Sequence, residues 1–337
     1  MSQRTAFVTG AAGFVGSHVV DRLLASGVSV VAVDSFEDYY PRAWKVANVQ
    51  QATGSPSFTL VEADILGLAG DGRACTNRLR ELVESADWVL HFAAQAGVRA
   101  SWGTSFGAYV TNNVLATQVL LEACKGTGIR RFVYASSSSV YGDTDRLPMR
   151  EDARCVPVSP YGVTKLAAEH LCGLYWKSFG VPTVSLRFFT VYGPRQRPDM
   201  AFHKFIRAML EGKPLDMYGN GAQTRDFTYV SDIVDGIAAA LDAPPGSVFN
   251  LGGGSRVTLA DAIRTLEACS GLEARVERHD VQDGDVRHTW ADLGRANADL
   301  AYVPKVSLDE GLAAEFAWLT EVLGGRARDS ALSLGGD

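Results

Sequence analysis

The sequence predicts a doubly wound α/β fold, in which a parallel sheet is covered by helices on both sides, with a smaller C-terminal α/β domain. Short β-branched runs alternate with helix-like segments throughout the first half of the chain. These runs are almost continuously apolar, which indicates parallel strands buried on both faces. After about residue 190 the alternation stops, and turn-rich stretches separate isolated helix-like patterns. The second half therefore builds a different unit.

Each expected strand is a short apolar run that ends at a polar or small residue. Six such runs occupy residues 5–9, 28–34, 57–64, 87–94, 130–136 and 182–189. Apolar residues at helical spacing lie between several of them, as in VVDRLLASG and YGVTKLAAEHLCGLYWKSFG. Further helices are expected at FHKFIRAMLEG, VSDIVDGIAAAL and LADAIRTLEACSG in the second half.

Composition excludes several classes of function. The 337-residue chain carries a net charge of −6, whereas nucleic-acid binding normally needs a basic face. No window approaches eighteen uninterrupted apolar residues and the N-terminus lacks a secretory pattern, so we expect a cytoplasmic protein outside the membrane. The five cysteines, Cys75 among them, form no C-x-x-C pair, and the histidines lack ligand spacing. We therefore expect no metal.

A glycine-rich turn follows the first expected strand. The stretch TGAAGFVG places Gly10, Gly13 and Gly16 three residues apart, with Phe14 and Val15 opening a helix-like segment. Glycines at this junction allow a tight turn and let backbone N–H groups approach a pyrophosphate at the helix N-terminus. The position of the triplet, more than its spacing, predicts a dinucleotide site of the Rossmann type.

The second and third expected strands end in carboxylates. Asp34 stands where an acidic residue accepts hydrogen bonds from the adenosine ribose and repels the 2′-phosphate of NADP. No arginine follows it to hold that phosphate, so NAD is the expected cofactor. Asp64 and Ile65, which end the third strand, are expected to contact the adenine.

These elements suggest a division of the chain. Residues 1–188 form the expected NAD-binding domain, rejoined by part of 226–250, and residues 189–323 form most of a substrate domain with a cleft between the two. Residues 324–337 (GGRARDSALSLGGD) are expected to be a disordered tail.

A tyrosine and a lysine lie four residues apart at the start of an expected helix, in SPYGVTK. The spacing puts Tyr161 and Lys165 on one helix face. A neighbouring ammonium group stabilises phenolate and is expected to lower the pKa of the tyrosine toward neutrality. The pair predicts a general base, although the spacing alone arises easily by chance.

Four serines end the strand that precedes this helix, in YASSSSVYG. Such a run is typical of a linker, but here it follows RRFVYA and precedes VYG. The serines should therefore lie above the carboxyl edge of the sheet with Tyr161, where a hydroxyl can relay a proton. Either Ser137 or Ser138 fills that role.

Together these motifs resemble the extended short-chain dehydrogenase/reductases that modify nucleotide sugars, over residues 4–322. The resemblance rests on TGAAGFVG, HFAAQAGVR, NNVLAT, YASSSSVYG, SPYGVTK and LRFFTVYGP. Within that group the chain is most similar to the UDP-glucuronic acid 4-epimerases, through FFTVYGPRQRPDM, QTRDFTYVSDIVDG and DGDVRHTWAD. This resemblance implies an NAD cofactor, a UDP-sugar substrate and a homodimer in which the helices near residues 105–125 and 160–179 pair.

The resemblance also implies roles for single residues. The cofactor side would be lined by Phe92, Ala93, Ala94, Asn113 and Ser136, with Asn113 completing the catalytic group from a helix. The nucleotide side would be held by Arg99 at the phosphates, Tyr218 at the uracil, Arg225 at the diphosphate and Asp285 at the uridine ribose. Without the resemblance, Arg225 and Asp285 would be taken as solvated surface charges.

Two positions in the serine run separate the possible reactions. The family's 4,6-dehydratases carry Asp-Glu before VYG, and its UDP-glucuronate decarboxylases carry Glu at the second position. This chain has Ser138 and Ser139 there. A hydroxyl near its ordinary pKa is a poor replacement for a carboxylate that must take a carbon-bound proton. Dehydration and decarboxylation are therefore disfavoured.

Two further positions indicate which sugar the site binds. UDP-galactose epimerases typically carry Asn at the position of Thr190, whereas threonine followed by Arg197 suggests a site for a carboxylate. Our hypothesis is that Ser139, Thr190 and Arg197 hold the glucuronate carboxylate in an orientation that prevents loss of CO2 from the 4-keto intermediate. A UDP-glucose/UDP-galactose 4-epimerase, a UDP-glucuronate decarboxylase and an NAD-sensing scaffold protein remain as alternatives.

Overall fold

The computed structural model describes residues 3–70, 78–280 and 284–333. Among them, seven strands form one parallel sheet in the order β11-β6-β5-β4-β1-β2-β3. These strands are β1 (Thr5–Thr9), β2 (Ser29–Asp34), β3 (Phe58–Glu62), β4 (Trp88–His91), β5 (Arg131–Ser137), β6 (Thr183–Phe188) and β11 (Ser247–Leu251). The doubly wound sheet predicted from the sequence is confirmed.

The order of the sheet reverses at β1, because β2 and β3 lie on one side of it and β4, β5 and β6 lie on the other. In open α/β sheets, ligands bind outside the carboxyl ends of the strands at such a switch point. The glycine turn follows β1 at this place. The topology therefore puts a ligand site between the ends of β1 and β4.

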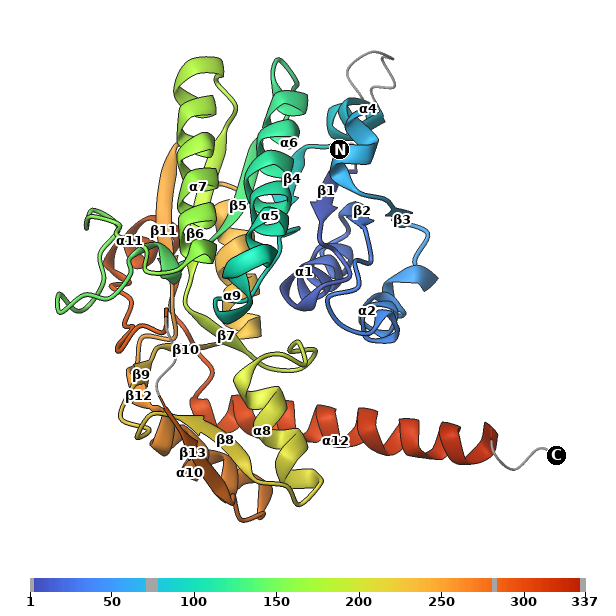
Figure 1. Cartoon of the computed structure of the whole chain (residues 1–337). Helices are drawn as coiled ribbons and strands as arrows, with labels where there is room; N and C mark the ends of the chain where they lie inside the picture. The colour runs from blue at the N-terminus through green and yellow to red at the C-terminus, as the bar shows by residue number, and fades with distance from the viewer. Residues whose placement is uncertain (1–2, 71–77, 281–283, 334–337) are drawn as a thin grey trace.

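Helices cover both faces of the sheet and separate two apolar cores (Figure 1). One core packs α1 (Phe14–Ala25) and α9 (Val230–Ala240) against the sheet. The other packs α3 (Ile65–Ala69), α4 (Arg78–Glu84), α6 (Ala116–Cys124) and α7 (Pro160–Phe179). Around these cores lie α2 (Arg42–Val49), α5 (Phe106–Tyr109), the π-helical turn η4 (Val110–Leu115), and the 3₁₀ turns η1 (Ala52–Gly54), η2 (Arg99–Ser101), η3 (Gly103–Ser105) and η5 (Ser138–Val140).

A second group of elements lies at the carboxyl edge of the sheet, at the bottom of Figure 1. Its helices are α8 (Ala201–Leu210), α10 (Leu259–Ser270) and α12 (Leu308–Ser333), whereas α11 (Gly294–Leu300) packs on the sheet domain against β11 and α9. Its strands pair as β7 (Thr190–Tyr192) with β10 (Phe227–Tyr229), β8 (Leu215–Tyr218) with β13 (Val276–His279), and β9 (Thr224–Arg225) with β12 (Val257–Thr258). A separate apolar core joins α8, α10 and α12.

The C-terminal segment differs from the expected disordered tail. Helix α12 continues to Ser333, so residues 324–333 are helical, and residues 334–337 lie outside the described residues. The segment RARDSALS contains several good helix formers, Ala, Arg and Leu, which extend a helix already nucleated against α8 and α10. The two glycines before it only weaken the helix.

Candidate active site

The cofactor end of the site is built by the turn between β1 and α1. Gly10 has a φ of +66°, and a Cβ there would lie 2.6 Å from the backbone nitrogen of Ala93. Only glycine therefore allows the ends of β1 and β4 to approach so closely. Helix α1 begins at Phe14, directly after this turn, so its first backbone N–H groups form an anion site. The glycine turn and the N-terminus of α1 thus form a binding site suited to a pyrophosphate.

Asp34 is fixed at the carboxyl end of β2. Its carboxylate accepts hydrogen bonds from the backbone N–H groups of Ala12, at 3.0 Å, and Phe36, at 2.9 Å. Lys45 Nζ lies 4.0 Å from Asp34 and donates to the carbonyl of Glu37. Sequence reasoning missed Lys45, which stands eleven positions further along the chain in a helix without a motif. These contacts hold the Asp34 carboxylate in place, where it can accept hydrogen bonds from the ribose hydroxyls of NAD.

Asp64 lies two residues after the end of β3 and begins α3, where its side chain accepts a hydrogen bond from Leu66 N at 2.8 Å. It thus caps a helix rather than ending a strand. Both Asp64 and Ile65 still face the cofactor end of the cavity.

Helix α7 positions the tyrosine and the lysine. Ser159 caps the helix by accepting a hydrogen bond from Gly162 N, which starts the helix one residue before Tyr161. One turn later, Lys165 is buried and donates from Nζ to the carbonyl of Ala135 at 2.9 Å. Burial lowers the pKa of Lys165 to about 7. The lysine is held against β5, beside the serine run.

The environment of Tyr161 differs from the sequence expectation. Burial raises the pKa of Tyr161, while a hydrogen bond with Ser137 and the charge of Arg197 act in the opposite direction. The pKa of the phenol is thus raised in the protein alone, because removal from water disfavours the charged form more than its neighbours favour it. Oxidised nicotinamide carries a positive charge, which favours phenolate when the cofactor is bound.

The serines of the run have different partners. Ser136 is buried, and its hydroxyl donates to Glu169 Oε2 at 2.6 Å. Ser137 ends β5, hydrogen-bonds with Tyr161 and accepts from Ser139 N at 3.1 Å, which starts the turn η5. Among the candidates for a proton relay, the hydrogen bond with Tyr161 favours Ser137 over Ser138.

A buried ion pair lies directly beneath the serine run. Arg187 on β6 donates two hydrogen bonds to Glu169 on α7, at 2.6 and 3.1 Å, and both side chains are 5% exposed. Glu169 stands one turn after Lys165 and also holds Ser136. The pair therefore ties β5, β6 and α7 together below the catalytic groups.

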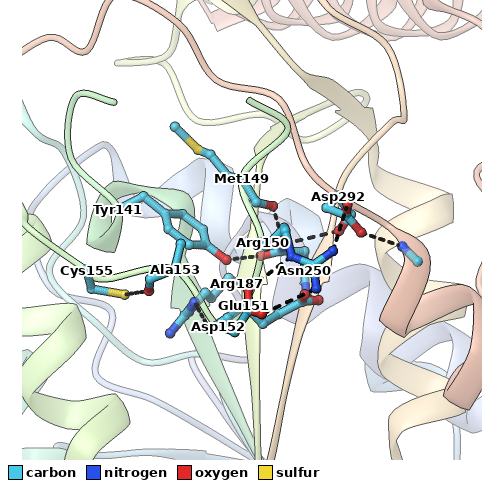
Figure 2. Close-up of polar contacts among 11 residues, drawn as sticks. Tyr141, Met149, Arg150, Glu151, Asp152, Ala153, Cys155, Arg187, Asn250 and Asp292 are labelled. Atoms are coloured by element: carbon cyan, nitrogen blue, oxygen red, sulfur yellow. Dashed lines mark hydrogen bonds and ion pairs between the residues drawn. The ribbon is translucent and has the colours of Figure 1, made fainter. Parts of the chain in front are cut away.

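The segment that follows the serines is anchored to strand β11 (Figure 2). Tyr141 donates to Asn250 Oδ1 at 2.6 Å, and Asn250 Nδ2 donates to the carbonyls of Met149 and Asp292. Arg187 lies over the Tyr141 ring, with its guanidinium carbon 4.7 Å from the ring centroid. This network fixes the far end of the serine turn and links it to the irregular segment between Asp285 and Asp292.

The substrate end contains Thr190 on β7 and Arg197 in the loop before α8. Arg197 makes two hydrogen bonds to Asp199, from Nε and Nη2, both at 2.9 Å. Tyr39, in the segment after β2, donates to the same carboxylate at 3.3 Å. Sequence reasoning missed Tyr39 and Asp199. Asp199 stands only two residues after Arg197 in RPDM, so its acidic side chain was a usable signal.

A second charged pair crosses the cavity at the nucleotide end. Arg99 Nη2 lies 2.7 Å from Asp285 Oδ2, and its guanidinium carbon lies 4.1 Å from the centroid of the Tyr218 ring. The structure thus brings three predicted substrate residues together, although they come from distant parts of the chain. Arg99 therefore lies beside the two residues expected to bind the uridine.

One cavity of about 1080 Å³ runs from the glycine turn to the second group of elements. Most of the predicted site residues line it: Gly10, Gly13, Phe14, Val15, Gly16, Asp34, Asp64, Ile65, Phe92, Ala93, Ala94, Arg99, Ser136, Ser137, Ser138, Ser139, Tyr161, Lys165, Thr190, Arg197, Tyr218 and Asp285. The residues predicted to bind the cofactor and those predicted to bind the substrate thus line one cavity.

Two predicted residues stand outside the lining of this cavity. Asn113 on η4 is buried, and its amide bonds both backbone groups of Gln95 and the hydroxyl of Thr164. It therefore holds the loop after β4. Arg225 donates to the carbonyls of Thr224 and Arg287, although the charges of Arg99 and Asp285 act on it.

In the part of the chain that the structure describes, no group of three or more His, Cys, Asp or Glu side chains is placed to hold a metal ion, and the four cysteines there are free. Cys75 lies outside it. No helix in residues 3–70, 78–280 and 284–333 has the length and apolar character needed to cross a membrane.

The fold and the site define a dinucleotide-dependent short-chain dehydrogenase/reductase: a glycine turn and a fixed aspartate at a sheet switch point, beside a Tyr-Lys pair and serine hydroxyls. The family model described as "NAD dependent epimerase/dehydratase family" matches residues 6–252. The chain belongs to this family, and the resemblance seen in the sequence is confirmed.

Relatives cover nearly the whole chain. A Bacillus subtilis (strain 168) protein described as an uncharacterized UDP-glucose epimerase, YtcB, is 44% identical, over 94% of this chain and 98% of its own. A UDP-glucuronate 4-epimerase of Thermodesulfobacterium geofontis (strain OPF15) is 37% identical, over 93% of this chain and 95% of its own length. The crystal structure of UDP-glucuronic acid 4-epimerase from Bacillus cereus, in complex with UDP-glucuronic acid and NAD, is 45% identical with a TM-score of 0.89, over 94% of this chain and 99% of that one.

Proposed function

We propose that this protein is an NAD-dependent UDP-glucuronic acid 4-epimerase, which interconverts UDP-glucuronic acid and UDP-galacturonic acid through a transient 4-keto sugar. The observation that carries this proposal is the set of side chains around Tyr161. Hydroxyls of Ser139 and Thr190 and the guanidinium of Arg197 line the cavity there, and no carboxylate stands in the serine run. Relatives with this activity are similar over nearly the whole chain.

The catalytic groups divide the work of the first half-reaction. Tyr161, as phenolate, takes the proton of the sugar 4-hydroxyl, and Ser137 relays that proton along its hydrogen bond with the tyrosine. When bound beside these residues, NAD would supply the acceptor and donor of the hydride at C4. Lys165 stabilises the phenolate from one turn away. The backbone contact of Lys165 with Ala135 keeps the helix and the serine strand in register.

The second half-reaction requires that the sugar present its other face. The 4-keto sugar turns about its diphosphate linkage, and Tyr161 returns the proton to the C4 oxygen as hydride is delivered to C4. The nucleotide stays in place meanwhile, held by the Arg99, Tyr218 and Asp285 group and, from outside the lining, by Arg225.

The carboxylate must be kept from leaving during this rotation. Oxidation of glucuronate at C4 makes a β-keto acid, which loses CO2 when the bond to the carboxyl group is parallel to the ketone π orbitals. In this proposal Ser139, Thr190 and Arg197 hold the carboxylate so that this bond stays near the carbonyl plane. Arginine suits that role as a planar donor with a permanent charge.

A UDP-glucose/UDP-galactose 4-epimerase is the second candidate, and one observation favours it. Arg197 already has a carboxylate partner in Asp199, so the pocket does not require a charged sugar. A UDP-glucuronate decarboxylase and an NAD-sensing scaffold protein are less well supported. Ser139 replaces the decarboxylase glutamate, and Tyr161, Lys165 and Ser137 are all assembled.

The proposal includes a cytoplasmic homodimer, divided into an NAD-binding domain of residues 1–188 and a substrate domain that is mainly 189–323. Large apolar side chains are exposed on the adjoining helices α5 to α7: Phe106, Val110, Leu115, Val163, Leu174 and Phe179. Such a surface is typical of a subunit interface. Sedimentation analysis of wild type and of Val163→Glu tests the dimer, which the charged substitution should dissociate.

The activity is tested by incubating the purified protein with NAD and either UDP-glucuronate or UDP-glucose, then separating the UDP-sugars by anion-exchange chromatography. The proposal expects UDP-galacturonate from UDP-glucuronate, with no net reduction of NAD. UDP-pentose as the main product would establish the decarboxylase instead. Turnover of UDP-glucose without turnover of UDP-glucuronate would establish the neutral-sugar epimerase.

A further inference from the structure

The arginine expected to hold the sugar carboxylate already binds a carboxylate of the protein. Arg197 Nε lies 2.9 Å from Asp199 Oδ1, and Nη2 lies 2.9 Å from Asp199 Oδ2. This is the two-bond geometry by which arginine binds a free carboxylate. Asp199 therefore occupies one edge of the guanidinium in the same manner as a uronate would.

The ion pair of Arg197 and Asp199 also has a partner in the sheet domain. Tyr39, which follows β2 in the sheet domain, donates to Asp199 Oδ2 at 3.3 Å, and Arg197 lies 6.0 Å from the Tyr39 ring centroid. The side chains of Arg197 and Asp199 are 20% and 32% exposed. Although burial acts against it, Arg197 holds the pKa of Asp199 below its usual range. Asp199 is thus an ionised, fixed partner.

The pair also faces the reacting groups. The charge of Arg197 acts on both Tyr161 and Lys165, and all three residues line the same cavity. Asp199 engages Nε and Nη2 of the guanidinium, whereas Nη1 donates to no acceptor in the described part of the chain. A second carboxylate can therefore approach Arg197 along its Nη1 edge without displacing the first.

We propose that Asp199 is a specificity-determining residue, which neutralises Arg197 and thereby sets the balance between uronate and uncharged hexose in the sugar pocket. With a neutral sugar, Arg197 keeps its ionic partner and no unpaired charge is enclosed. With a uronate, Asp199 repels the incoming carboxylate and reduces the attraction of Arg197. The native pocket is thus less selective for uronates than a lone arginine would make it.

This inference rests on the proposed function, because it concerns the sugar that the same site takes. The test is therefore made on binding, which does not need turnover. Calorimetry gives the dissociation constants of UDP-glucuronate, UDP-glucose and UDP with wild type, Asp199→Asn and Tyr39→Phe, in the presence of NAD. UDP is the matched probe, since it lacks the sugar.

Asp199→Asn should increase the preference for UDP-glucuronate over UDP-glucose by about tenfold or more, with the affinity for UDP unchanged. Tyr39→Phe removes a contact but no charge and should leave the preference within about twofold. In an Arg197→Met background, Asp199→Asn should no longer increase the preference. An unchanged preference in Asp199→Asn, or an equal loss of affinity for both sugars, would overturn the inference and make Asp199 a structural residue. Conversion of the two sugars by wild type tests the proposed function separately.

Discussion

Two ion pairs illustrate the difference between the two sides of the active-site cavity. Beneath the serine run, Arg187 and Glu169 are both 5% exposed and bind each other through two hydrogen bonds. At the nucleotide end, Arg99 and Asp285 are 47% and 26% exposed and meet across the cavity. The first pair is enclosed by the fold, whereas the second remains open to water and to a ligand.

The same contrast holds for the groups around each pair. On the catalytic side, Lys165 bonds a backbone carbonyl and Ser136 bonds a buried carboxylate. On the substrate side, Arg197 and Arg99 bond carboxylates of their own chain. Folding thus fixes the groups that move protons and hydride, while the groups that bind the sugar nucleotide have protein partners that a ligand can replace or share. The four predictions that follow test this contrast.

The largest effect is expected for Tyr161→Phe, which removes the proposed base from the catalytic side. Turnover of UDP-glucuronate should fall about 10⁴-fold, because general base catalysis contributes up to that amount. Tyr175→Phe is a matched control on the same helix, since the Tyr175 hydroxyl bonds Glu122 and Gln118 away from the cavity, and it should keep its turnover. Steady-state kinetics measures the turnover of both variants, and circular dichroism shows whether they are folded. A comparable fall in turnover in both variants would contradict the assignment of Tyr161 as the base.

Arg187→Met should lower the free energy of unfolding by about 3–5 kcal/mol, because it leaves the Glu169 carboxylate buried without its partner. The double variant Arg187→Met, Glu169→Met removes the unpaired charge and should recover much of that loss. Denaturant titration followed by circular dichroism measures both. If the single variant were as stable as wild type, the pair would not be the brace described above.

Ser137→Ala should lower kcat about ten- to a hundredfold, because a hydrogen bond to a charged group contributes about 1.5–3 kcal/mol. Ser138→Ala should have a smaller effect, since Ser137 is the serine hydrogen-bonded with Tyr161. The measurement is kcat for both variants at saturating UDP-glucuronate. A larger loss in Ser138→Ala would assign the proton relay to that residue instead.

The smallest effect on stability is expected for Arg99→Met. The pair with Asp285 is half exposed, and such pairs contribute about 0–1 kcal/mol. Unfolding under the conditions used for Arg187→Met should therefore differ from wild type by less than about 1 kcal/mol. A loss of 3 kcal/mol or more would place Arg99 among the structural ion pairs and remove the contrast between the two sides.

The sequence was a good guide where a local rule governs the structure. The six expected strands correspond to β1 to β6, because parallel buried strands leave unbroken apolar runs. Gly10 stands where its positive φ and the close approach of Ala93 require glycine. The Tyr-Lys spacing likewise puts Tyr161 and Lys165 on one face of α7.

Features that depend on distant packing were less predictable. Asn113 and Arg225 bond backbone groups of neighbouring loops instead of lining the cavity, and no sequence spacing reveals where those loops run. The pKa of Tyr161 depends on the depth of burial, which outweighs the hydrogen bond with Ser137 and the charge of Arg197. Tyr39 and Asp199 meet across 160 positions, so their contact was not visible in the sequence.

The central claim is that the pocket oxidises and re-reduces a uronate at C4 while it retains the carboxylate. Its most direct test follows UDP-glucuronate labelled with ¹³C at the carboxyl carbon, incubated with the protein and NAD, by ¹³C NMR. The account predicts that the label is divided between UDP-glucuronate and UDP-galacturonate, with none in bicarbonate. Label appearing in bicarbonate together with UDP-pentose, or no conversion of UDP-glucuronate while UDP-glucose is turned over, would contradict it.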